Sequence, residues 1–196
     1  MENTTKERIL DEALVCFANY GYKGTNLRDL AAGLNLSKSA LYKHFTSKED
    51  IWNAVIDRME AYYSERFGSP ERPPETPKTC EELRQMTSRM LDFTMHDRKI
   101  ILTRQLLLTE QFHDERAKNL TTAHFLTGTT AIYTHVFAEM MQNGVLKSDD
   151  PEMLAFAFTA PISTLIQLCD REPEKEAEIM RRIEAFTEHF IKTYAK

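Results

Sequence analysis

Basic side chains gather in one short segment of an acidic chain. The chain has 196 residues and a formal net charge of −5. Between residues 23 and 48, by contrast, Asp29 is the single acidic residue, and the basic residues are Lys23, Arg28, Lys38, Lys43 and Lys48. Lysine and arginine bind phosphates, and together with serine they can donate hydrogen bonds to base edges. The segment therefore has the chemistry of a nucleic-acid-binding surface.

Short helices are expected to position these side chains. A helix of about residues 27–34, a three-residue turn and a second helix ending near Phe45 have helix-turn-helix spacing. Asn35 can take the left-handed conformation that ends the first helix, and Ser37 can cap the second. In such a motif the second helix enters the major groove of DNA and the first braces it. We therefore place a helix-turn-helix at about residues 26–45.

The helices on either side of this motif begin with capping signals. Thr4 and Glu7 have capping-box spacing, and apolar residues then recur every three or four positions until Gly21. Ser47 and Asp50 repeat the capping pattern before a long helix. The sequence thus predicts four helices in about the first 65 residues.

Four stretches of the sequence together carry a resemblance to a known family. They are RILDEA (8–13), FANYGYKGT (17–25), LAA (30–32) and LSKSALYKHFTSKE (36–49). Over about the first 55 residues the chain resembles the DNA-binding domain of TetR-family transcriptional regulators. That resemblance implies an all-helical, homodimeric regulator, most often a repressor, that reads a palindromic operator in double-stranded DNA and responds to a small-molecule effector.

The resemblance also implies a set of DNA contacts. Carried over position by position, they are Arg28, Lys38, Ser39, Tyr42, Lys43, His44 and Lys48. We assign Tyr42 and Lys48 to phosphates and Lys38, Ser39 and Lys43 to base edges; His44 either contacts a phosphate or only wedges the helix pair. The family's usual turn glycine falls on Asn35. The glycine and threonine that the family often has at the start of the recognition helix fall on Ser39 and Ala40. We therefore expect a different base preference but the same docking on DNA.

The rest of the chain is expected to be helical and to form a second domain. Four prolines between Gly68 and Thr79 predict a surface loop, and Thr79 with Glu82 opens a further helix. A left-handed stop at Asn143-Gly144 and prolines after Asp150 and Glu172 mark later helix boundaries. We divide the all-α chain into a DNA-binding domain (1–48), a connecting helix (49–67) and an effector-binding and dimerisation domain (79–196).

An effector pocket is expected between the helices that run from Glu82 to Gly144. Its candidate lining residues are Met90, Phe93, Thr94, Arg104, His124, Phe125, Thr127 and Tyr133. Side chains of these types at helical spacing also fill the core of any helical bundle, so both interpretations stay open. The apolar stretch Met153–Cys169 and the last helix would form a four-helix dimer interface, or else internal core.

Other classes of function lack a positive feature in the sequence. The three cysteines are far apart, and His124 and His135 would lie about 16 Å apart along a helix, so no metal site is predicted. We find no catalytic motif and expect no cofactor and no enzyme activity. The polar start of the chain predicts a cytoplasmic protein, and the uncharged stretches 120–138 and 153–169 are interpreted as buried helices without membrane contact. An activator, or a helical interaction protein without specific DNA binding, is the alternative.

Overall fold

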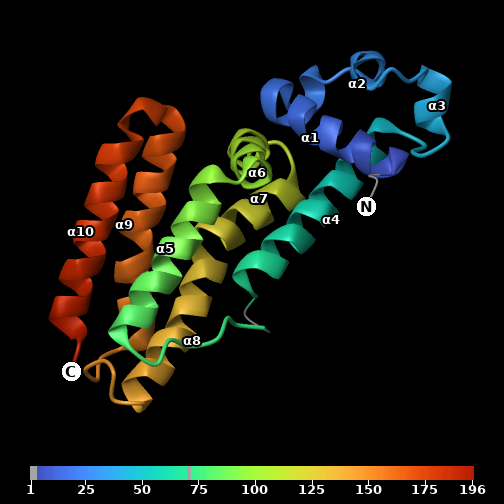
Figure 1. Ribbon diagram of the computed structural model, residues 1–196. Helices are drawn as coiled ribbons and strands as arrows, with labels where there is room; N and C mark the ends of the chain where they lie inside the picture. The colour runs from blue at the N-terminus through green and yellow to red at the C-terminus, as the bar shows by residue number, and fades with distance from the viewer. Residues whose placement is uncertain (1–3, 70–71) are drawn as a thin grey trace. The chain divides into compact units, whose positions relative to one another are not determined.

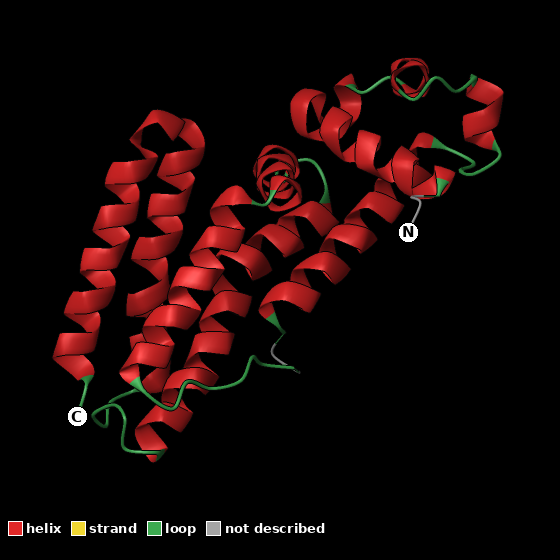
Figure 2. Ribbon diagram, viewed as in Figure 1, coloured by secondary structure: helices red, strands yellow, loops and turns green. Residues whose placement is uncertain are grey.

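The computed structural model describes residues 4–69 and 72–196, and the regular elements in this part of the chain are helices (Figures 1 and 2). The all-helical fold predicted from the sequence is confirmed. The elements are α1 (Thr5–Gly24), α2 (Leu27–Gly33), α3 (Lys38–Tyr42), α4 (Lys48–Phe67), α5 (Cys80–His96), α6 (Arg98–Glu110), α7 (Glu115–Thr122), the π-helix η1 (Ala123–Thr127), α8 (Gly128–Gln142), α9 (Pro151–Arg171), the 3₁₀-helix η2 (Pro173–Lys175) and α10 (Glu176–Tyr194).

Capping side chains fix most of the helix starts. The Thr4 hydroxyl accepts the Glu7 N–H at 3.3 Å, and the Glu7 carboxylate accepts the Thr4 N–H in return. The Asp150 carboxylate accepts two N–H groups in the first turn of α9. These predicted starts are confirmed. Glu172-Pro173, however, begins the one-turn η2 before α10 starts, a common use of 3₁₀ geometry at a helix end.

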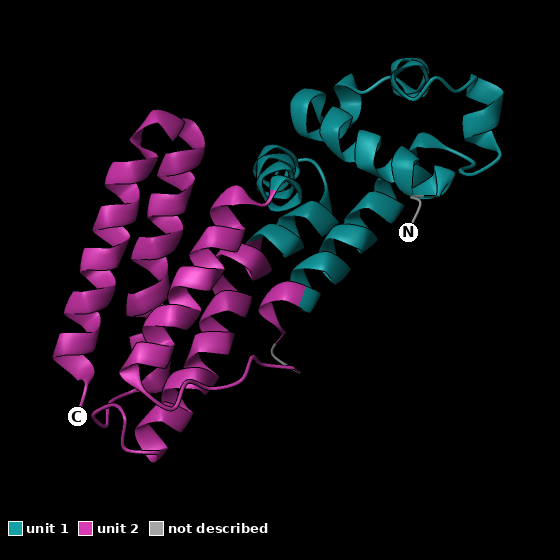
Figure 3. Cartoon of the chain, viewed as in Figure 1, with its two compact units in different colours: residues 1–65, 98–121 teal, residues 66–97, 122–196 magenta. Residues whose placement is uncertain are grey.

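The chain divides into two compact units (Figure 3). Unit 1 comprises residues 1–65 and 98–121, and unit 2 comprises residues 66–97 and 122–196. The predicted division into residues 1–48, 49–67 and 79–196 is a division by function, and it remains a prediction. By packing, α6 and α7 belong with α1–α4, because Leu106, Leu107 and Ala117 are fully buried in the same core as Phe17.

The core of unit 1 is built around an aromatic contact between α1 and α4. Phe17 is fully buried, and its ring meets the Trp52 ring edge-on at 5.2 Å. Leu30 from α2 and Leu41 from α3 are also fully buried in this cluster. Burial of each such side chain contributes about 1.5–3 kcal/mol. The two short helices are therefore held by side chains that they bury, since seven and five residues are too few for a helix to be stable alone.

Aromatic rings fill the core of unit 2. Phe137, Phe158 and Phe190 come from α8, α9 and α10, and the Phe158 and Phe190 rings lie 4.6 Å apart. Leu83 and Met86 bring α5 into the same cluster. Unit 2 is thus a helical bundle whose four long helices share one core.

Helix α9 is buried on one side only. Leu154 and Phe158 are inside, whereas Met153 and Phe156 are 62% and 48% exposed. By length and composition α9 could also cross a membrane, with 28% of its apolar window buried within unit 2. The interpretation of residues 153–169 as a buried helix therefore holds for one face, and the other face is apolar and uncovered in the single chain.

Candidate nucleic-acid interface

Side-chain caps and one left-handed residue build the helix-turn-helix. The Asn26 side chain accepts the Arg28 N–H at 2.9 Å, which starts α2, and Ser37 accepts the Ala40 N–H at 3.1 Å, which starts α3. Between the two helices Asn35 has a φ of 55°, as predicted from its type. The motif expected from the spacing is therefore present.

Helix α3 is shorter than predicted. It ends at Tyr42, and the next turn is tight, because the His44 and Phe45 N–H groups both donate to the Leu41 carbonyl. Phe45 is nevertheless 2% exposed and packs in the core of unit 1 with Leu41. The inner face of the motif is thus the predicted one, although part of it is a turn and not a helix.

The outer face of α3 is polar and basic. Lys38, Ser39, Tyr42 and Lys43 are all exposed, and the Lys38 ammonium lies 5.7 Å from the centre of the Tyr42 ring. The Ser39 hydroxyl lies 3.0 Å from that of Ser37. Arg28 on α2 and His44 after α3 are exposed as well. The structure therefore brings these six predicted contact residues together on α2, α3 and the following turn.

Lys48 differs from the other predicted contacts. It is half-buried at the start of α4, where its ammonium lies 4.6 Å from the centre of the Tyr22 ring and 3.5 Å from the Lys23 carbonyl. Burial lowers the pKa of Lys48, and the Glu110 carboxylate opposes this. The end of α1 therefore holds the Lys48 side chain in place. This contact keeps the Lys48 ammonium close to the surface of the helix-turn-helix.

A buried carboxylate from α6 fixes the end of α1. Gly21 has a φ of 70° and kinks the helix, and the N–H of Tyr22 then donates to Glu110 at 2.9 Å. Glu110 is 6% exposed. The Tyr22 ring packs against Trp52 at 5.3 Å. Glu110 and Tyr22 thus position Lys48; the sequence showed Gly21 as a helix end but carried no signal of a partner 88 positions away.

The segment that contains this motif matches a known family. Residues 9–55, which include all of α2 and α3, match the family described as bacterial regulatory proteins, tetR family. Residues 9–55 are thus similar to the TetR-family domain. Within this matched segment the fully buried Ile9, Phe17, Leu30 and Leu41 form the framework that holds the exposed residues of α3.

Curated relatives share the TetR-family domain. The chain is 45% identical over 51 residues to IcaR of Staphylococcus aureus, the HTH-type negative transcriptional regulator of the biofilm operon icaADBC. It is 34% identical over 58 residues to IcaR of Staphylococcus epidermidis. These matches span 26% and 30% of this chain and 27% and 31% of the relatives. The similarity in sequence is therefore confined to less than a third of each protein.

Solved structures extend the similarity in fold beyond the TetR-family domain. SmeT, the repressor of the Stenotrophomonas maltophilia multidrug efflux pump SmeDEF, superposes with a TM-score of 0.70 over 98% of this chain and 91% of SmeT. Its complex with triclosan gives a TM-score of 0.73, over 98% and 92%. The sequence identities are 19% and 20%, so these structures show a common fold alone.

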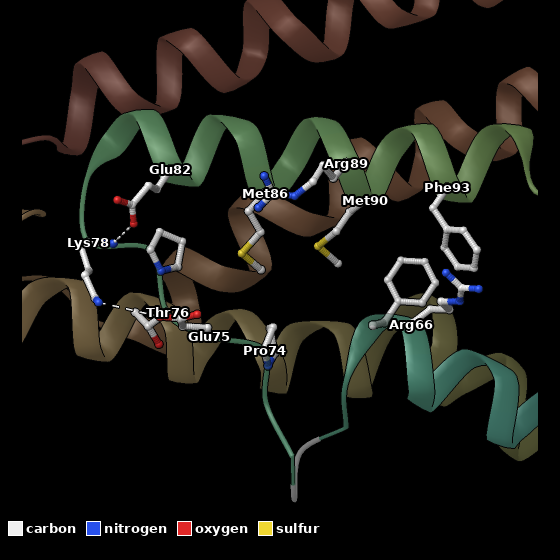
Figure 4. Close-up of a pocket in the computed structure, with 12 residues that line it drawn as sticks. Arg66, Pro74, Glu75, Thr76, Lys78, Glu82, Met86, Arg89, Met90 and Phe93 are labelled. Atoms are coloured by element: carbon white, nitrogen blue, oxygen red, sulfur yellow. Dashed lines mark hydrogen bonds and ion pairs between the residues drawn. The ribbon is translucent and has the colours of Figure 1, made fainter.

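Two of the predicted effector residues line a pocket in unit 2. Met90 and Phe93 contribute to a pocket of about 640 Å³ next to the loop that follows α4 (Figure 4). Tyr133 is 4% exposed, and its hydroxyl donates to the Met90 sulfur at 3.4 Å; burial raises the pKa of Tyr133 to about 12. Thr94 is half-buried on α5. Tyr133 thus supports the pocket from the core behind Met90.

The other predicted effector residues lie elsewhere. His124, Phe125 and Thr127 belong to the π-helix η1 in unit 2, and burial lowers the pKa of His124 to about 4. Arg104 is 6% exposed on α6 in unit 1. Among residues 4–69 and 72–196, no three His, Cys, Asp or Glu side chains are grouped closely enough to hold a metal ion.

Proposed function

We propose that this chain is a sequence-specific, DNA-binding transcriptional regulator that acts as a repressor. The observation that carries the proposal is the exposed polar surface of α3 and its C-cap, where Lys38, Ser39, Tyr42 and Lys43 surround a helix anchored by the fully buried Leu41. The family match and the name of IcaR as a negative regulator support both the DNA binding and its direction. The protein would act in the cytoplasm, where its operator is.

The residues of the motif divide between positioning and reading. Tyr42 and Lys48 would contact phosphates, and Lys38, Ser39 and Lys43 would reach base edges in the major groove. Arg28 and His44 are both exposed and would add contacts to the DNA backbone. Ser39 is placed for direct reading because it lies in the first turn of α3, the part of a recognition helix that approaches the bases.

The active form would be a homodimer. Met153 and Phe156 leave an apolar face on α9, and the last helix presents a second amphipathic surface beside it. Two copies packing α9 and α10 together would form a four-helix interface and remove that face from water. A two-fold dimer presents two α3 helices, which explains why the operator would be palindromic.

A small molecule in unit 2 would release the DNA. The solved complex of SmeT with triclosan supports a ligand site in this fold. The effector must bind more tightly to the conformation that does not fit the operator, because a ligand can shift an equilibrium only by its difference in affinity for the two states.

Selection from a pool of randomised duplexes tests the proposed function. The full chain is incubated with the pool, bound duplexes are recovered over several rounds and their sequences are compared. We expect an inverted repeat with half-sites about one helical turn apart. Recovery of unrelated sequences after many rounds would contradict sequence-specific binding.

Two lysine variants separate the reading role from the positioning role. Lys43→Ala should weaken binding to the selected duplex about tenfold and reduce the preference for it, since a base contact contributes about 1–3 kcal/mol. Lys48→Ala should weaken binding to all duplexes equally and lower the salt dependence by about one ion. Fluorescence anisotropy titrations at several salt concentrations measure both effects. Lys118→Ala, an exposed lysine on α7, is the control. Equal behaviour of all three variants would refute the assignment.

A further inference from the structure

The first turn of α1 meets the turn that follows α3. Lys6 lies in this first turn, and its ammonium is 5.4 Å from the centre of the Phe45 ring (Figure 1). Phe45 is 2% exposed, and it directly follows His44, one of the exposed residues predicted to contact DNA. A cation from α1 therefore lies beside the helix-turn-helix, although Lys6 is outside the basic segment 23–48.

The position of Lys6 on α1 directs its side chain toward the motif. Lys6 precedes the buried Leu10 and Ala13 by four and seven residues, so it lies on the helix face that packs into the core of unit 1. Lys6 itself is exposed, at the edge of that face. Arg8 is exposed as well, but side chains two positions apart on a helix do not share a face. The two cations therefore lie on different sides of α1.

The charge of Lys6 is available to a ligand. Among residues 4–69 and 72–196, no carboxylate forms an ion pair with Lys6. Glu7, the next residue, accepts the Thr4 N–H, and Asp50 accepts the Thr46 N–H at 2.9 Å. The face of the Phe45 ring attracts the ammonium electrostatically, but a lysine has three N–H donors and the ring leaves them able to bind an oxygen anion.

We propose that Lys6 is a further DNA contact, which binds a backbone phosphate where the strand passes the turn after α3. This inference rests on the proposed function. The Phe45 ring holds the ammonium in place before DNA arrives, so less side-chain freedom is lost on binding. Because phosphates are common to all sequences, Lys6 adds affinity without adding base preference. The interface then extends from α2, α3 and the start of α4 onto α1.

Fluorescence anisotropy of the full chain at several salt concentrations tests the proposal, on the selected duplex and on a shuffled duplex of equal composition. Lys6→Gln should weaken binding to both duplexes by the same factor, about fivefold, at near-physiological salt. It should also lower the slope of log affinity against log salt concentration by about 0.9, the value for one phosphate contact on B-form DNA. Lys6→Arg keeps the charge and should keep the slope. Arg8→Gln removes a charge from the same helix and should behave like the unmodified chain.

Three results would overturn the assignment of Lys6. A slope for Lys6→Gln equal to that of Arg8→Gln would show that no phosphate contact is lost. Weaker binding with an unchanged slope would indicate that Lys6 only packs on Phe45, and a larger loss on the selected duplex than on the shuffled one would indicate a base contact. A chain that binds neither duplex would refute the proposed function together with this contact, whereas an unchanged slope in a chain that binds DNA refutes this contact alone.

Discussion

Gly21→Ala is expected to lower the free energy of unfolding by about 3 kcal/mol, the combined effect of a strained backbone and a displaced hydrogen bond. Gly21 has φ 70° and ψ 171°, a conformation essentially restricted to glycine. A Cβ atom there would lie 2.7 Å from the Glu110 carboxylate oxygen that accepts the Tyr22 N–H. The variant is therefore destabilised in two ways: its backbone is strained, and the Tyr22 N–H is left without its acceptor.

Gly144→Ala is the matched control for Gly21→Ala. Its φ is 73°, but no atom lies within 4 Å of the added Cβ, so about 1 kcal/mol is expected from the backbone alone. Urea unfolding followed by far-UV circular dichroism measures both variants, and Trp52 fluorescence reports unit 1 directly. Equal losses for the two variants would show that the contact with Glu110 has no energetic role. Because Tyr22 holds Lys48, Gly21→Ala should also weaken DNA binding, whereas Gly144→Ala should not.

Acid should destabilise the protein through His124. Burial lowers its pKa to about 4 in the folded chain, against an ordinary value of 6.5. The unfolded chain therefore binds a proton first as the pH falls through 6.5, and the free energy of unfolding decreases down to the folded pKa. The expected loss approaches about 1.4 kcal/mol per pH unit and totals about 3 kcal/mol by pH 4.

The pH dependence is measured by urea unfolding at pH 7.0, 5.5 and 4.5. His124→Gln cannot titrate, so its free energy of unfolding should fall less steeply than that of the unmodified chain across this range. Parallel slopes for the two proteins would contradict a buried neutral His124.

His96 provides a control of opposite sign. Glu176 and Asp92 accept hydrogen bonds from its ring and raise its pKa. The contribution of His96 to the free energy of unfolding is fully present below pH 6.5. It is lost as the pH rises through the raised pKa of the folded chain. The group is half exposed, so the contribution is small. His96→Gln should therefore alter the profile on the alkaline side and leave the slope between pH 6.5 and 4 in place.

Local signals in the sequence predicted the helix-turn-helix well. Thr4, Asn35 and Ser37 act through bonds or backbone conformations that involve residues at most three positions away, and each has the predicted role. The inner face of α3 was predictable for a similar reason, since Leu41 and Phe45 are separated by about one turn. Once the inner face is known, the side chains on the opposite face of the motif are predicted to be exposed.

Contacts between distant parts of the chain could not be predicted. The hydrogen bond from Tyr22 to Glu110 and the packing of α6 into unit 1 depend on tertiary structure, which no local pattern encodes. The pocket is a similar case. The sequence predicts the proline-rich loop only as a connection, yet Pro74 and Lys78 in this loop line the pocket. Arg66 and Arg89 also line the pocket, and neither is among the effector residues predicted from the sequence.

Sequence-specific DNA binding is tested most directly by fluorescence anisotropy of the full chain on the duplex from upstream of its own coding region. A shuffled duplex of equal length and composition is the control, at low and at near-physiological salt. We expect both duplexes to bind at low salt, and only the upstream duplex to stay tightly bound as the salt concentration rises. An absence of binding to either duplex at low salt would contradict the assignment of α3 as a DNA-reading helix.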